Sequence, residues 1–130
     1  MKVEILTLCD FAQTYRDRLT VVGAFSSINA QKFPVDITDV SFVAKIAMEK
    51  PDNRKHDVEI SIKKEGEEEP VFGPIAAPLD LSDNKEDFLE ANLIIKIGHL
   101  TIPSQGKYHL VFSFDGNETT TPLSVAEQKQ

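Results

Sequence analysis

Apolar side chains occupy every second position between Gly106 and Phe114: Tyr108, Leu110, Phe112 and Phe114. Because successive side chains of a β-strand point to opposite faces of a sheet, this spacing predicts a half-buried strand. The Asp115-Gly116 dipeptide that follows is typical of a tight hairpin turn. The pattern therefore predicts two consecutive antiparallel strands near the end of the chain.

Eight segments with a strand-like pattern follow one another along the chain, separated by turn residues. They are residues 2–13, 18–27, 40–50, 56–64, 71–79, 88–97, 106–114 and 117–125. Short strands at intervals of about ten residues are typical of sandwiches and barrels. Helical periodicity is nearly absent, and only residues 83–90 are compatible with one or two helical turns. The chain is therefore predicted to be all-β, an antiparallel sandwich of seven to nine strands.

The predicted core consists of nine side chains from the alternating segments: Phe42, Ile46, Val58, Ile60, Leu93, Ile95, Tyr108, Leu110 and Phe112. Tyr108 stands near the start of the penultimate strand, two residues after Gly106. This position resembles the tyrosine corner of immunoglobulin-like sandwiches, in which the hydroxyl binds a neighbouring loop. A plain core tyrosine fits the pattern equally well. With one Cys and no Trp, the chain lacks the inter-sheet disulfide of antibody domains.

The length of 130 residues is typical of one domain that buries its own core. We predict a single β-sandwich domain over residues 1–125 and a polar, frayed tail over residues 126–130.

The chain is acidic, with a net charge of −7 and no cluster of Lys and Arg interleaved with aromatic residues. Such a chain repels nucleic acids and anionic membranes on average, so neither is expected as a partner. The only cysteine, Cys9, suits a reducing compartment. The first apolar run is short and is interrupted by Glu4, unlike the core of a signal peptide. We therefore expect a cytoplasmic protein.

No catalytic motif is recognisable in the sequence. There is no Gly-x-Ser-x-Gly elbow and no glycine-rich phosphate loop. Cys9 lies inside a predicted strand, where a buried thiol behaves as a small apolar group. We therefore predict no catalytic residue and no cofactor.

The sequence also lacks residues at the spacing that metal-binding motifs require. His56, His99 and His109 lie too far apart in the sequence to form a paired motif. Residues 80–87 place oxygen-bearing side chains at the first ligand positions of a calcium loop, but Lys85 stands where glycine is required and Ala91 where a bidentate Glu belongs. We predict a solvated connecting loop and no metal site, with a weak, non-helical calcium site as the alternative.

The N-terminal third shows a more specific pattern. Leu8-Cys9-Asp10-Phe11-Ala12, the segment 19–25 that contains Gly23, and the later Pro34 resemble a family of small, uncharacterised, mostly bacterial proteins of unknown function. In that family an aliphatic-x-Asp-aromatic-Ala strand leads into a second strand that ends at a glycine. Residues 56–60, 65–66, 106–108 and 115–116 fit its middle and end. The resemblance implies an immunoglobulin-like β-sandwich and no functional residues.

Three functions remain open from the sequence. The first is a non-catalytic binding or assembly module, either of another protein or of itself. The second is a small-molecule binder or an enzyme of unrecognised type, which a pocket joining Asp10, a histidine and Tyr15 would favour. Carbohydrate binding ranks third, because the chain has no Trp and two Tyr residues as stacking platforms.

A homodimer is also predicted, through an apolar spot on the outer face of one sheet. Val43 and Val111 occupy outward positions of two segments expected to be neighbours in an immunoglobulin-like order. Two apolar side chains on an exposed sheet face favour isologous pairing in a twofold dimer.

Overall fold

Strands make up most of the chain. The computed structural model describes residues 1–128. Its strands are β1 (Lys2–Tyr15), β2 (Arg18–Phe25), β3 (Ser27–Ala30), β4 (Val35–Glu49), β5 (Lys55–His56), β6 (Val58–Lys64), β7 (Phe72–Ala76), β8 (Leu79–Asp80), β9 (Phe88–Ile102), β10 (Gly106–Phe114) and β11 (Asn117–Glu127). No helix occurs in these residues, and therefore none that could cross a membrane.

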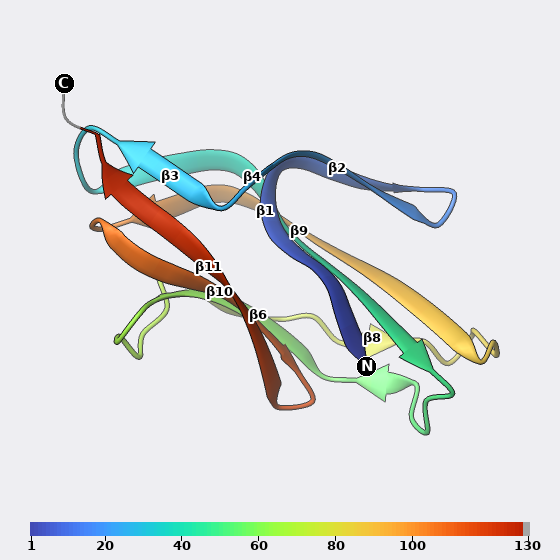
Figure 1. Cartoon of the computed structure of the whole chain (residues 1–130). Helices are drawn as coiled ribbons and strands as arrows, with labels where there is room; N and C mark the ends of the chain where they lie inside the picture. Colours follow the sequence, from blue (N-terminus) through green and yellow to red (C-terminus); the bar gives the residue numbers. More distant parts are fainter. Residues whose placement is uncertain (129–130) are drawn as a thin grey trace.

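Two larger sheets pack against each other (Figure 1). Sheet A has the strand order β2-β1-β4-β9, and sheet B has the order β3-β11-β10-β6-β7. β5 and β8 form a separate two-stranded sheet. The all-β prediction is confirmed, but the described residues contain eleven strands, and β3 runs parallel to β11. The prediction missed β3, β5 and β8 because a strand of two to four residues is too short to show an alternation of apolar and polar side chains.

One apolar core fills the space between sheets A and B. Its largest fully buried side chains include Tyr108, Phe42 and Phe112. All nine residues predicted for the core belong to it, with Leu93 and Ile95 partly buried. Burying a large apolar side chain stabilises a fold by roughly 1.5–3 kcal/mol, so this cluster is the main reason that the two sheets stay together.

β4 and β9 are longer than predicted because both change face partway along. In the first part of β4 the odd-numbered Val35 and Ile37 pack on the core. In the second part the even-numbered Val40 and Phe42 do so. The inward-facing side changes from odd-numbered to even-numbered residues at Asp39, whose φ of 55° lies outside the ordinary strand conformation. A strict two-residue period therefore begins only at residue 40, where the sequence predicted the strand to begin.

The C-terminal strand runs further than predicted. Ala126 and Glu127 pair with β3, and the backbone N–H of Gln128 donates to the carbonyl oxygen of Ala30 at 2.8 Å. The expected frayed tail is therefore wrong for residues 126–128. Residues 129–130, the rest of that prediction, lie outside the described part of the chain.

Tyr108 makes the contact expected of a tyrosine corner. The side chain is fully buried, and its hydroxyl donates to the backbone carbonyl of Ser104 at 2.6 Å. The bond joins β10 to the loop that precedes it. It satisfies a hydroxyl that would otherwise lie unpaired in the core.

Val43 and Val111 do not form the predicted apolar spot. β4 lies in sheet A and β10 in sheet B, so the assumption that these strands are neighbours is wrong. Val43 is 0% exposed in a cluster beneath the β1–β2 hairpin, and Val111 is 6% exposed. Val111 lies between Ser61 and Thr120 of its neighbouring strands. The two valines therefore share no exposed surface.

Candidate functional site

The end of β1 and the whole of β2 form a two-stranded ribbon that leaves sheet A (Figure 1). The pairing of β1 with β4 ends at Cys9 and Ser41, whereas its pairing with β2 continues to Tyr15 and Arg18. From Asp10 onward, both edges of the ribbon are therefore free of ladder partners within residues 1–128.

The inner face of the ribbon covers the outer face of sheet A. Ala12 is buried there with Cys9 and Val43, and Leu19 and Val21 pack against the same cluster. This second apolar cluster is separate from the main core and fixes the position of the ribbon. Burial raises the pKa of the Cys9 thiol, which is consistent with the inert thiol predicted from the sequence.

The outer face of the ribbon carries large apolar side chains that are about half exposed among the described residues. Phe11 is 46% exposed, Val22 is 52% exposed, and the two are direct cross-strand partners. Tyr15, at the end of β1, is 59% exposed, and the guanidinium of Arg16 lies 5.3 Å from its ring centroid. We call Phe11, Tyr15 and Val22 the ribbon strip. The sequence analysis missed it because alternation shows that two faces differ but not which face is covered.

Asp10 lies at the point where the ribbon leaves the sheet. Its carboxylate lies directly over Gly23, so that a Cβ at residue 23 would collide with it. Gly23 has a φ of 69°, a conformation that glycine adopts far more readily than other residues. Asp10 of the segment 8–12 and Gly23 of the segment 19–25, which the family resemblance singled out, are therefore parts of one bend.

A shallow hollow of about 260 Å³ adjoins this bend. It is lined by Asp10, Phe11, Asp39, Val40, Ser41, Lys96, Ile97 and Gly98. Small-molecule sites usually measure roughly 300–1,000 Å³ and have an enclosed apolar lining. Neither a histidine nor Tyr15 lines the hollow, so the pocket that would have favoured a small-molecule binder is not assembled here.

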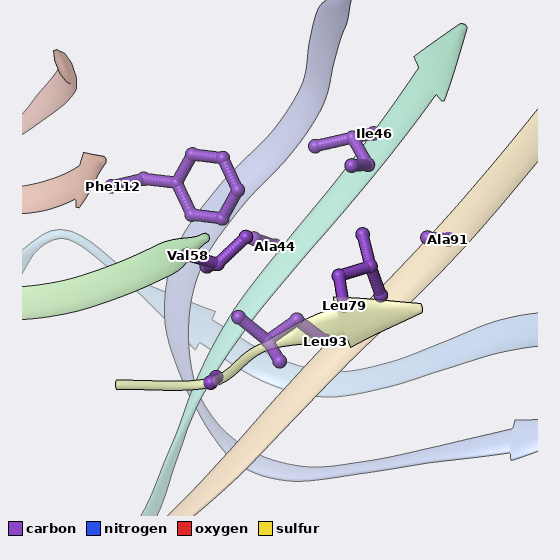
Figure 2. Close-up of a pocket in the computed structure, with 8 residues that line it drawn as sticks. Ala44, Ile46, Val58, Leu79, Ala91, Leu93 and Phe112 are labelled. Carbon is purple, nitrogen blue, oxygen red and sulfur yellow. The ribbon is translucent and has the colours of Figure 1, made fainter. Parts of the chain in front are cut away.

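The cavity between the sheets beside Phe112 is too small for a ligand. It has a volume of about 10 Å³ and is lined by Ala44, Ile46, Val58, Ala77, Leu79, Ala91, Leu93 and Phe112, all of them apolar residues. Figure 2 shows seven of these side chains with their labels. A buried water needs roughly 10–15 Å³ and two to four polar partners. We interpret this cavity as a packing gap.

His56 makes a partly enclosed polar contact with Asp115. Its Nδ1 lies 2.7 Å from Oδ2 of Asp115, its ring stacks on Phe114, and its side chain is 8% exposed. The other carboxylate oxygen of Asp115 accepts the backbone N–H of Asp57 at 2.9 Å. Nε2 of His56 is buried and has no hydrogen-bond partner among residues 1–128. The contact joins the β5–β6 junction to the β10–β11 turn and brings no nucleophile to the ring.

Asp115 should give the fold a measurable acid sensitivity. The hydrogen bond from His56, and then that from Asp57, hold the pKa of Asp115 below its ordinary 3.8. A lowered pKa means that the stabilisation is present above about pH 4 and is lost as the pH falls through the folded-state value. We expect the melting temperature of Asp115→Asn to fall less than that of the unmodified protein between pH 5 and pH 3. Glu118→Gln, which removes an exposed carboxylate beside the same turn, is the control. Equal pH slopes in all three proteins would contradict the role of Asp115.

The remaining residues singled out from the sequence lie apart from one another. His99 contacts Asp36 on the surface at 2.9 Å. In the acidic segment, Asp80 and Asn84 accept the backbone N–H groups of Ser82 and Glu86, and the hydrogen bonds from Ser82 lower the pKa of Asp80. Across residues 1–128, no three His, Cys, Asp or Glu side chains are placed to hold a metal ion.

The fold makes this chain an all-β protein in which two packed sheets carry a two-stranded ribbon with an apolar outer face. The chain belongs to a family of unknown function (DUF6941), which matches residues 4–126. Comparison with curated proteins and with solved structures gives no match.

Proposed function

We propose that this protein is a non-catalytic protein-binding module and that the ribbon strip is its contact surface. The observation that carries the proposal is the exposure of Phe11, Tyr15 and Val22 on one face of a ribbon whose other face is anchored. Aromatic side chains at the centre of a contact account for much of the binding energy of protein interfaces.

The anchored inner face is what makes the strip suitable for binding. Because Ala12 and Val21 are held against sheet A, the ribbon cannot turn over to bury Phe11 in its own core. The strip is therefore preorganised, which lowers the entropic cost of association. A partner protein with an apolar patch fits this surface.

The test compares proteins captured from an extract of the source cells by the unmodified chain and by Phe11→Ser/Val22→Ser. We expect at least one protein to be retained by the unmodified chain and lost with the double variant. That protein, once purified, should bind the variant at least about tenfold more weakly in calorimetry, because two contact side chains are removed.

Lys107→Ser/Glu118→Ser is the matched control, since it alters two exposed residues of sheet B. It should retain the same protein with unchanged affinity. Equal retention by the ribbon variant and the control would overturn the proposal, and circular dichroism of each variant shows that it is folded.

We also propose that the two sheets have an immunoglobulin-like arrangement. Two observations support this topology: β3 pairs in parallel with β11 at the edge of sheet B, and Tyr108 makes its contact near the start of the penultimate long strand. A cytoplasmic location stays our proposal, supported by a single, buried cysteine.

A further inference from the structure

β9 is an edge strand over its whole length. It pairs with β4 from Phe88 to Ile102, and sheet A ends there. Among residues 1–128, no backbone hydrogen bond outside the β4 ladder involves β9. The middle of the strand is half-buried from Ala91 to Ile95. A long, apolar edge with unpaired backbone groups is a template for another strand, unless the protein protects it.

We propose that this edge pairs with the β9 strand of a second copy, so that sheet A continues across a twofold axis. The inner faces of both copies must then lie on the same side of the joined sheet. Directly opposite residues of two antiparallel strands point to the same face of the sheet. The twofold axis must therefore pass between the two copies of one residue, which lie opposite each other. The sequence of β9 identifies this residue as Leu93.

The charges of β9 select this register. With the axis at Leu93, residues whose numbers sum to 186 are opposite, and Glu90 therefore faces Lys96 of the second copy. The pair occurs twice because of the symmetry. Lys96 is exposed and has no ion pair among the described residues, whereas Glu90 lies 3.6 Å from Lys45 in its own chain. Opposite charges directly across two strands stabilise the pairing.

The uncharged side chains are complementary in the same register. On the outer face, Phe88, which is 51% exposed, faces Gly98 of the second copy, where the space above the Cα is open. An aromatic ring packed over an edge glycine compensates for the missing side chain. On the inner face, the small Ala91 faces the large Ile95, and Leu93 meets its own copy.

Neighbouring registers lack this complementarity. An axis at Asn92 or Ile94 leaves Glu90 and Lys96 without opposite charges. An axis at Glu90 or Lys96 places like charges directly opposite each other, which destabilises the pairing. The proposed occupant of the edge is therefore a second copy of this chain.

The first test exchanges the two charges. Sedimentation equilibrium of the full chain should show a dimer at tens of micromolar, and Lys96→Glu should raise the dissociation constant about tenfold or more, because two attractive pairs become repulsive. Glu90→Lys/Lys96→Glu restores opposite charges and should return the constant to within about threefold of the original. Glu118→Lys, on β11, is the control and should change little.

The second test locates the axis by a disulfide. Leu93→Cys places two thiols opposite each other and should give a covalent dimer under mild oxidation. Lys96→Cys separates the two thiols by six positions, about 20 Å, and should not. Cys9 is buried and does not interfere.

A monomeric unmodified protein at these concentrations would overturn the proposal. A dimer that is insensitive to Lys96→Glu, or that crosslinks equally through residues 93 and 96, would also overturn it. Circular dichroism of each variant separates loss of dimerisation from loss of folding. If the ribbon variant Phe11→Ser/Val22→Ser still forms the dimer, the two surfaces are separate.

Discussion

Replacing Phe112 by Ala is expected to lower the free energy of unfolding by about 3–5 kcal/mol. The ring is 1% exposed and packs in the core between sheets A and B. It also lines the small cavity shown in Figure 2, so its removal enlarges an existing gap. Urea denaturation of the purified variant measures the loss.

Phe11→Ala is the matched control for this prediction, because Phe11 carries the same ring on the exposed face of the ribbon. Its loss should cost less than about 1 kcal/mol, since surface substitutions usually have small effects. A cost below about 1 kcal/mol for Phe112→Ala would show that the inner face of β10 is assigned wrongly.

Val43→Asp is expected to prevent stable folding. Val43 is fully enclosed by Cys9, Ala12 and the side chains that pack on them. A carboxylate there loses its hydration and gains no partner, a cost of several kcal/mol against a total stability of about 5–15 kcal/mol. Circular dichroism and thermal unfolding provide the measurement.

Val22→Asp makes the same exchange at an exposed position of the ribbon, and it should leave the fold intact. A folded Val43→Asp protein would mean that the ribbon does not cover the outer face of sheet A. It would then support the exposed position that the sequence pattern had suggested for Val43.

The alternation of apolar residues predicted strands and core where a strand keeps one phase. β10 and its turn at Asp115 were predicted with the correct bounds, and all nine predicted core residues belong to the observed core. Prediction was less accurate where the phase changes. Asp39 has a positive φ, and after it the even-numbered residues of β4 face the core instead of the odd-numbered ones. No local pattern reveals such a residue in advance.

The candidate site depended on information that alternation does not contain. Phe11 and Ala12 are adjacent and both apolar, yet one is exposed and the other is buried against Val43. The difference arises because the ribbon lies over only one face of sheet A. The family resemblance marked this segment as distinctive, but it implied no functional residues in it.

The sequence by itself determined the all-β class, the main strands, the inner face of most of them and the acidic charge, because these depend on local periodicity and composition. Only the tertiary structure decided that β4 and β10 lie in opposite sheets, that the ribbon covers Val43, and that β9 is the edge strand of sheet A. The physical reason is that strand order and coverage depend on contacts between residues far apart in the chain. A period of two describes the two faces of one strand, and it carries no information about which strand lies beside it.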